Sequence, residues 1–262
     1  MAEAVAHYTV IEPIGGGTLG PLHRARDGKT GRTVALRLVD PRITAGADAR
    51  DRLQLALQRA ARLSHPNIAS FYDVGEHHGQ LFYAQEFVPG ALLSAQTADP
   101  LNARRAAGYA AEIADALAEL EAADLQHGNV GAGAVMITPK GRAKLLLDAG
   151  FAAAVGDAAK PLADLDGLGR LIALMLTGAD SSRALPPELA PIIDRCLNAG
   201  YATAALAAAD LRAVVDALEA RAIPASPAPV ARAAERSKAW IWLLMVALLV
   251  AAVAAIWLAT RA

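Results

Sequence analysis

The chain has 262 residues, of which 55% are hydrophobic and 19% are charged, and its formal net charge is −1. This length is enough for one two-lobed domain or two small domains. The near-neutral charge argues against nucleic acid as a partner. The single cysteine, Cys196, excludes an internal disulfide and fits a reducing compartment. We expect no signal peptide, because the first residues have no basic stretch followed by an apolar run.

The first part of the chain, residues 8 to 40, predicts two or three antiparallel strands. A turn within it has the spacing Gly-x-Gly-x-x-Gly, at Gly15, Gly17 and Gly20, and Leu22 follows. This spacing alone is a weak signal, because an ordinary β-turn can have the same composition. The run Val-Ala-Leu-Arg that follows predicts a strand and ends on a cation, Arg37.

Residues 48–63 predict a helix with an apolar face. That face comprises Leu53, Leu57, Ala60 and Leu63. Further along, His77 and His78 precede Gly79 in a predicted turn between two strands. No cysteine or carboxylate pattern accompanies this histidine pair, so a turn is favoured over a metal site.

Residues 102–123 predict a second helix, whose apolar positions recur at helical spacing. The predicted core face of this helix is Ala106, Tyr109, Ala110, Ile113, Leu117 and Leu120. A loop beginning Gln-His-Gly-Asn-Val-Gly follows and contains His127 and Asn129. A strand-turn-strand then ends in Lys-Leu-Leu-Leu-Asp-Ala-Gly, which contains Asp148.

These motifs together resemble those of the bacterial serine/threonine protein kinases, over about residues 8–220. In that family a loop His-Arg-Asp-x-x-x-x-Asn is followed by Asp-Phe-Gly. The resemblance implies an α+β, protein-kinase-like bilobal fold. A small antiparallel β lobe would occupy about residues 8–88, and a larger helical lobe would occupy about residues 89–220.

The resemblance is weakest where the family carries its chemistry. Asn129 falls at the position of the catalytic aspartate, and Ala134 at that of the second metal ligand. Gly131 replaces the loop lysine, and Ala56 falls where the family has the helix glutamate that pairs with the strand lysine, here Arg37. Since Asn is no useful base and Ala has no oxygen ligand, no catalytic residue is intact.

The activation segment of the family is also shortened. Residues 151–163 contain no Ser, Thr or Tyr and no Ala-Pro-Glu sequence. Asp148 is the remaining candidate metal ligand. An alternative register, which we leave open, would put Leu147 at its position, because the leucine run before it is one residue longer than usual.

An ATP cleft is what the resemblance implies for cofactors, with weak or no Mg²⁺ binding. The candidate cofactor-binding residues are Gly15, Gly17, Gly20, Leu22, Ala35, Arg37, Glu86, Val88 and Met136. Most of these would act through backbone groups or small apolar side chains, so the cleft does not depend on the lost catalytic groups. The same residues would equally suit a packed core.

The C-terminal part differs in composition. Residues 221–238 are rich in Pro and Ala and predict a juxtamembrane linker. Residues 239–260 predict a transmembrane helix, because no charge occurs between Trp240 and Leu258, a helical length of roughly 28 Å. Basic residues precede this run, so we expect a single-pass protein of the inner (cytoplasmic) membrane, with its kinase-like domain facing the cytoplasm.

Three functional hypotheses follow. The leading one is a membrane-anchored pseudokinase that acts in signalling or as a scaffold by binding protein partners and is still able to bind ATP. The alternative is a weakly active, atypical serine/threonine protein kinase. The third is a nucleotide-free structural scaffold.

Overall fold

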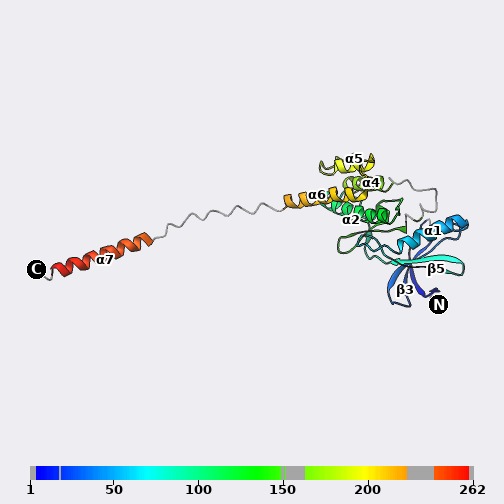
Figure 1. Cartoon of the computed structure of the whole chain (residues 1–262), viewed down its shortest axis with the longest axis horizontal. Coiled ribbons are helices and arrows are strands. Elements are labelled where there is room, and N and C mark those ends of the chain that lie inside the picture. The colour runs from blue at the N-terminus through cyan, green and yellow to red at the C-terminus, as the bar shows by residue number, and fades with distance from the viewer. Residues whose placement is uncertain (1–3, 18, 149–150, 152–162, 223–238, 260–262) are drawn as a thin grey trace. The chain divides into compact units, whose positions relative to one another are not determined.

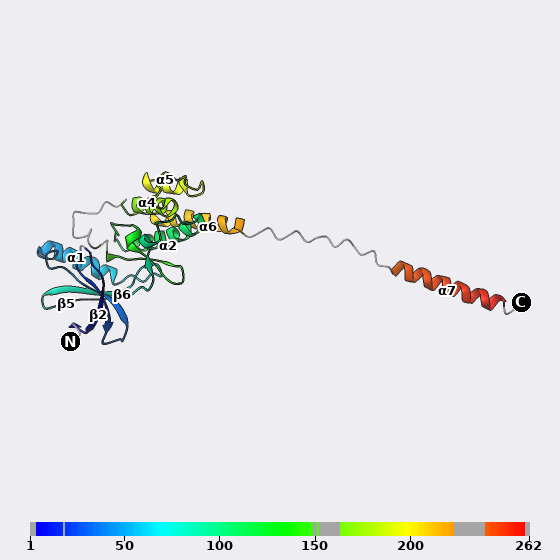
Figure 2. The ribbon, with the colours of Figure 1, turned by 180° about the vertical axis from the view of Figure 1, so that it is seen from behind.

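The computed structural model describes residues 4–17, 19–148, 151, 163–222 and 239–259. The chain divides into two compact units, Met1–Ala220 and Arg221–Ala262. Within the first unit, the strands of the larger sheet lie together with α1 in one lobe, and α2, α4, α5 and α6 lie in the other (Figures 1 and 2). This is the small β lobe and larger helical lobe that the sequence predicts.

The small lobe is built on a six-stranded antiparallel sheet with the order β1-β2-β3-β4-β6-β5. Its strands are β1 Ala4–Val5, β2 Tyr8–Gly15, β3 Leu22–Asp27, β4 Thr33–Leu38, β5 Phe71–His77 and β6 Gln80–Glu86. The predicted turn between β5 and β6 contains His78 and Gly79, both with positive φ. The Nδ1 atom of His77 accepts a hydrogen bond from the backbone N–H of Ala6, which is a structural role.

Helix α1, Ala47–Ala60, packs beside this sheet and buries Leu53, Leu57 and Ala60. The helix ends three residues earlier than we expected. Leu63 therefore follows it in a turn, where it is partly buried against the same core.

The large lobe is organised around α2, Ala103–Ala122. Its six predicted core residues are all buried, as the helical spacing indicates. The Oδ1 atom of Asn102 accepts a hydrogen bond from the N–H of Arg105 and so caps the first turn. The other helices are α4 Ala163–Thr177, α5 Ala190–Leu197 and α6 Ala204–Ala222.

A second, three-stranded sheet has the order β7-β8-β9. Its strands are β7 Ala91–Leu92, β8 Val135–Ile137 and β9 Ala143–Leu145. Short 3-10 turns, Leu93–Ala95 and Ala132–Ala134, flank it. A parallel bridge joins Ile68 to Leu145, so the chain leading into β5 is hydrogen-bonded to this small sheet.

The second unit has one described helix, α7, Ala239–Ala259. Most of the predicted linker, residues 223–238, lies outside the described residues. We expected a transmembrane helix at 239–260; within the described ranges, no helix is long and apolar enough to cross a bilayer.

Candidate functional site

A cavity of about 520 Å³ lies between the large sheet and the small one. This volume falls in the range of small-molecule sites. The lining residues are Ile14, Gly15, Gly16, Gly17, Leu19, Leu22, Ala35, Arg37, Glu86, Phe87, Val88, Gly90, Leu92, Asn129, Gly133, Ala134, Met136, Leu146 and Asp148. Most of these residues are glycines or have apolar side chains. The charged residues among them are Arg37, Glu86 and Asp148.

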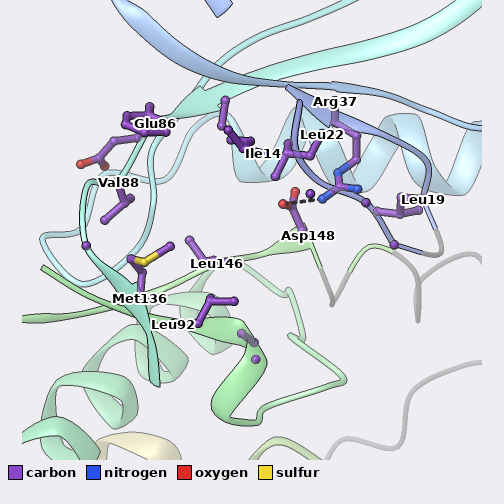
Figure 3. Close-up of a pocket in the computed structure, with 18 of the residues that line it drawn as sticks. Ile14, Leu19, Leu22, Arg37, Glu86, Val88, Leu92, Met136, Leu146 and Asp148 are labelled. Carbon is purple, nitrogen blue, oxygen red and sulfur yellow. Dashed lines mark hydrogen bonds and ion pairs between the residues drawn. The ribbon is translucent and has the colours of Figure 1, made fainter. Parts of the chain in front are cut away.

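All nine predicted cofactor-binding residues except Gly20 line this cavity. Gly20 does not line the cavity but helps to hold Arg37 in place, because its carbonyl oxygen accepts a hydrogen bond from Nη1 of Arg37 at 2.6 Å. Figure 3 shows Arg37 and Asp148 at one end of the cavity and Val88 and Met136 at the other. The cavity thus has a charged end at Arg37 and Asp148 and a largely apolar end at Val88 and Met136, where Glu86 also lies.

Several lining residues escaped the sequence analysis, among them Leu19, Phe87, Leu92 and Leu146. Leu146 belongs to the leucine run before Asp148 and directly follows β9, where continued alternation could have marked it as facing away from the buried Leu145 and Leu147. Leu19 and Phe87 lie in irregular segments, and Leu92 lies in the two-residue strand β7, which is too short for a periodic signal.

At the charged end of the cavity, Arg37 of the small lobe forms an ion pair with Asp148 of the large lobe. Nη2 of Arg37, on β4, lies 3.0 Å from Oδ2 of Asp148, and the two side chains are 6% and 14% exposed. The cross-strand neighbour of Arg37, Tyr83, donates its hydroxyl to Oδ1 of Asp148. Gln85 donates from Nε2 to Oδ2 at 2.9 Å. Both carboxylate oxygens are therefore engaged by protein donors.

The ion pair is electrostatically consistent with its surroundings. Burial acts to lower the pKa of Arg37, but the nearby Asp148 carboxylate outweighs it, so the pKa is raised. Burial, reinforced by the same carboxylate, raises the pKa of Tyr83 well above its usual value. Tyr83 therefore stays a neutral donor and Arg37 stays a cation.

The structure shows which of the two residues, Leu147 or Asp148, faces the cavity. Asp148 lines the cavity, whereas Leu147 is 3% exposed and belongs to the hydrophobic core. The next two residues, 149 and 150, lie outside the described residues. Leu147 has no carboxylate to offer, so Asp148 is the acid at this end of the cleft.

The residues around Asp148 do not fit a Mg²⁺ site. Mg²⁺ requires near-octahedral oxygen coordination with free carboxylate ligands. Here the carboxylate of Asp148 already accepts three hydrogen bonds. Ala134, at the second ligand position, has no side-chain oxygen. No group of three acidic, histidine or cysteine side chains that could hold a metal occurs within the described part of the chain.

His127 is a buried structural residue. Its Nε2 lies 2.9 Å from the carbonyl oxygen of Leu146, and its Nδ1 accepts from the N–H of Asn129 at 3.3 Å. These two contacts define a neutral ring protonated on Nε2. Asp164, in the first turn of α4, accepts from the N–H groups of His127 and Gly128 at 2.7 and 2.6 Å. The loop that carries Asn129 is therefore held from two sides.

The apolar end of the cavity is held by a second ion pair. Nζ of Lys144 lies 2.7 Å from Oε2 of Glu86, and both side chains are mostly buried. The same Glu86 oxygen accepts from the N–H of Ser70 at 3.2 Å. Val88, two residues on, lines the cavity. Its N–H and C=O make no hydrogen bond to another described residue, so both are available to a ligand.

The Asp-Ala-Gly triplet lacks the phenylalanine of the family motif, but Phe151 follows the triplet directly and is buried. Phe151 is 5% exposed and packs edge-on against Phe71 and Tyr83, with ring centroids 5.2 and 6.0 Å away. Its backbone N–H donates to the carbonyl of Leu147 at 3.2 Å. The sequence analysis missed this role. Residues 152–162, most of the shortened activation segment, lie outside the described residues.

Ala56 and Ala134 show how the structure accommodates two of the losses. Ala56, on α1, is partly buried against the hydrophobic core and offers Arg37 no charge. Ala134 is 3% exposed, and its carbonyl accepts from the N–H of Leu146 at 2.8 Å. Asn129 lines the cavity, and its side chain is exposed.

This architecture is that of the protein kinases. A family model for the protein kinase domain matches residues 8–169, so the chain belongs to that family. Membership implies, in general, a cleft for ATP and Mg²⁺.

Particular relatives are serine/threonine-protein kinases of Mycobacterium tuberculosis. PknD is 32% identical over 152 residues, which is 57% of this chain and 23% of PknD. PknI is 30% identical over 192 residues, which is 70% of this chain and 33% of PknI. The chain therefore matches only a quarter to a third of these relatives' lengths. The crystal structure of the PknI kinase domain superposes with a TM-score of 0.69 at 24% identity, covering 81% of this chain and 98% of that one.

Proposed function

We propose that this protein is a pseudokinase: a kinase-like unit that acts in signalling or as a scaffold by binding a protein partner and does not transfer phosphate. The observation that carries the proposal is the engagement of Asp148 by Arg37, Tyr83 and Gln85. Phosphoryl transfer depends on metal ions and on a carboxylate that orients the nucleophile. The carboxylate of Asp148, the candidate metal ligand, is occupied by protein donors. The carboxylate that would orient the nucleophile is replaced by the amide of Asn129.

The remaining substitutions support the same proposal. Ala56 provides no acid for Arg37, and Ala134 provides no metal ligand. Residues 151–163 contain no hydroxyl side chain that a regulatory phosphorylation could modify. Each change alone could be compensated by a neighbour. Together they remove the base, the metal site and the regulatory segment.

The test is transfer of labelled phosphate from ATP, with Mg²⁺ or Mn²⁺, by the full chain in detergent. We expect no label above background, on a generic protein substrate or on the chain itself. The matched variants are Ile14→Glu, which places a charge on the cavity wall, and Ile11→Glu, an exposed position on the same strand outside the cavity. Labelling that is lost in Ile14→Glu and kept in Ile11→Glu would contradict the proposal.

A weakly active, atypical kinase is the second candidate. It is favoured by the placement of both Arg37 and Asp148 in the cleft. Loss of a general base typically costs about 10²–10⁴-fold, which leaves a slow reaction detectable. The same labelling experiment decides between the two candidates.

We also propose that the C-terminal segment anchors the protein at the inner membrane, with the kinase-like unit in the cytoplasm. The support is the uncharged run from Trp240 to Leu258 and the basic residues Arg232, Arg236 and Lys238 before it. Fractionation of cells expressing the full chain or a chain ending at Lys238 tests this. Equal resistance of both to alkaline extraction from membranes, or equal release, would contradict it.

A further inference from the structure

We propose that the cleft binds an uncharged, planar heterocycle of the nucleoside type without a divalent metal, and that Arg37 takes the place of the metal as the partner of Asp148. This inference rests on the proposed pseudokinase function and specifies the ligand of the same cleft. It predicts that phosphate groups and Mg²⁺ add little to affinity.

The first argument is charge balance. The charged side chains that line the cavity are Arg37, Glu86 and Asp148. Arg37 is paired with Asp148, and Glu86 is paired with Lys144. Among the described lining residues, no cation is therefore left over for a phosphate, whose binding in proteins usually relies on unpaired Lys or Arg donors.

The second argument is the cost of admitting a metal. A Mg²⁺ ion at Asp148 would have to displace Arg37, whose side chain is only 6% exposed. Removing one partner of a buried ion pair is strongly unfavourable, because the other charge stays buried and uncompensated. The α1 position at which the family has a glutamate is Ala56, so this position offers Arg37 no replacement acid. The glycine-rich turn would also lose the Arg37 bond to the Gly20 carbonyl.

The third argument is the apolar lining of the cavity, which is suited to a flat ring. Leu22, Ala35, Val88, Met136 and Leu146 line the cavity and are all apolar. The backbone N–H and C=O of Val88 offer an adjacent donor and acceptor without partners among the described residues. Apolar walls with a few orienting polar groups are typical of small-molecule sites.

Isothermal titration calorimetry of the full chain in detergent, with adenosine and with ATP, each in Mg²⁺ and in EDTA, tests the inference. We expect adenosine to bind. The affinity for ATP should exceed the affinity for adenosine by less than about tenfold, and Mg²⁺ should not raise it. MgATP binding more than about tenfold more tightly than adenosine would overturn the inference. Ile14→Glu should abolish adenosine binding, and Ile11→Glu should retain it; equal affinities in both would place the ligand outside this cavity and overturn the inference.

Arg37→Lys supplies a positive test of the ion pair. A lysine ammonium lacks the planar fork with which Arg37 reaches both Asp148 and the Gly20 carbonyl. This variant should gain a dependence of ATP affinity on Mg²⁺ that the wild-type chain lacks. A variant that folds, by circular dichroism, and stays indifferent to Mg²⁺ would contradict the role given to Arg37.

The outcomes for the two proposals are separable. A wild-type chain that binds neither adenosine nor ATP overturns this inference and leaves the pseudokinase proposal standing, as a nucleotide-free scaffold. Phosphate transfer in the labelling assay overturns the pseudokinase proposal, whatever the calorimetry shows.

Discussion

Nη2 of Arg37 lies 3.0 Å from Oδ2 of Asp148, although the two residues are 111 positions apart in the sequence. One belongs to the strand β4 of the small lobe, and the other follows β9 of the large lobe. The pair therefore connects the lobes across the charged end of the cleft (Figure 3). Since Arg37 also donates to the Gly20 carbonyl, a single guanidinium ties together the glycine-rich turn, the sheet and the large lobe.

The ion pair should contribute strongly to stability only as a pair. Asp148→Ala leaves the Arg37 guanidinium buried and uncompensated, and we expect a loss of about 3–5 kcal/mol in the free energy of unfolding. Replacing both residues, as Arg37→Met with Asp148→Leu, should restore most of that loss, because apolar side chains of similar volume often substitute well for buried pairs. Urea unfolding followed by far-UV circular dichroism measures both variants.

The matched control for this pair is Asp166→Asn. Asp166 pairs with Arg170 on the surface of α4, where both side chains are well exposed. Exposed helix pairs contribute little, so this variant should unfold at nearly the wild-type urea concentration. A double variant no more stable than Asp148→Ala would show that the charges are needed for the fold.

Two glycines of the same turn should respond differently to alanine. Gly20 has φ +113°, and a Cβ there would overlap the carbonyl oxygen of Leu38. We expect Gly20→Ala to destabilise the chain by about 2 kcal/mol or more, since the strain of such a backbone conformation is about 1–3 kcal/mol before any overlap. At Gly17 a Cβ would meet only Nη1 of Arg37, at 4.0 Å. Gly17→Ala should therefore change stability by no more than about 0.5 kcal/mol.

Thermal or urea unfolding of the two glycine variants gives the comparison. Equal effects at both positions would contradict the backbone geometry described for Gly17 and Gly20. The pair also separates stability from binding, because Gly17 lines the cavity and Gly20 does not.

Stability should fall with acidification because of His127. Burial lowers the pKa of His127 below its usual 6.5, against the opposing effects of the Leu146 carbonyl and the charges of Asp164 and Asp148. The unfolded chain therefore takes up this proton first as the pH falls. The contribution of His127 to stability is complete above about pH 6.5 and is lost as the pH falls from there towards the folded-state pKa, by up to about 1.4 kcal/mol per pH unit.

Urea unfolding between about pH 7.5 and 5.5 measures this slope. His127→Phe removes the titrating group and should flatten the curve, whatever its effect on absolute stability. His78→Asn is the control, because His78 is exposed in the β5–β6 turn at φ 50°, a conformation that Asn tolerates. A wild-type slope that His127→Phe leaves unchanged would assign the pH dependence to other groups.

Phe151 should behave as a core residue and not as part of a surface segment. Its ring packs edge-on against Phe71 and Tyr83. We expect Phe151→Ala to cost about 3–5 kcal/mol of unfolding free energy, the usual range for a buried Phe. Leu55→Ala, at a position of α1 that is 51% exposed, should stay within about 0.5 kcal/mol of wild type. Chemical denaturation measures the free energy of unfolding of both variants. If Phe151→Ala lowered it as little as Leu55→Ala does, Phe151 would not be held in the core.

Much of the fold could be predicted from local pattern. The 3.6-residue period of α2 identifies its buried face, because apolar side chains on one face of a helix must pack together. The positive-φ turn at His78 and Gly79 follows from residue types that tolerate that conformation. The end of α1 could not be placed in this way, because Leu63 continues the apolar spacing after the helix has stopped and packs against the core from a turn.

The substitutions behind the pseudokinase proposal could be recognised from residue identity alone. The amide of Asn129 is no useful base, and the methyl group of Ala134 cannot bind a metal in any conformation. The pairing of Arg37 with Asp148, and the burial of Phe151 between Phe71 and Tyr83, depended on which distant segments the fold brings together. The strength of an ion pair depends on distance and burial, and neither quantity can be read from the spacing of residues along the chain.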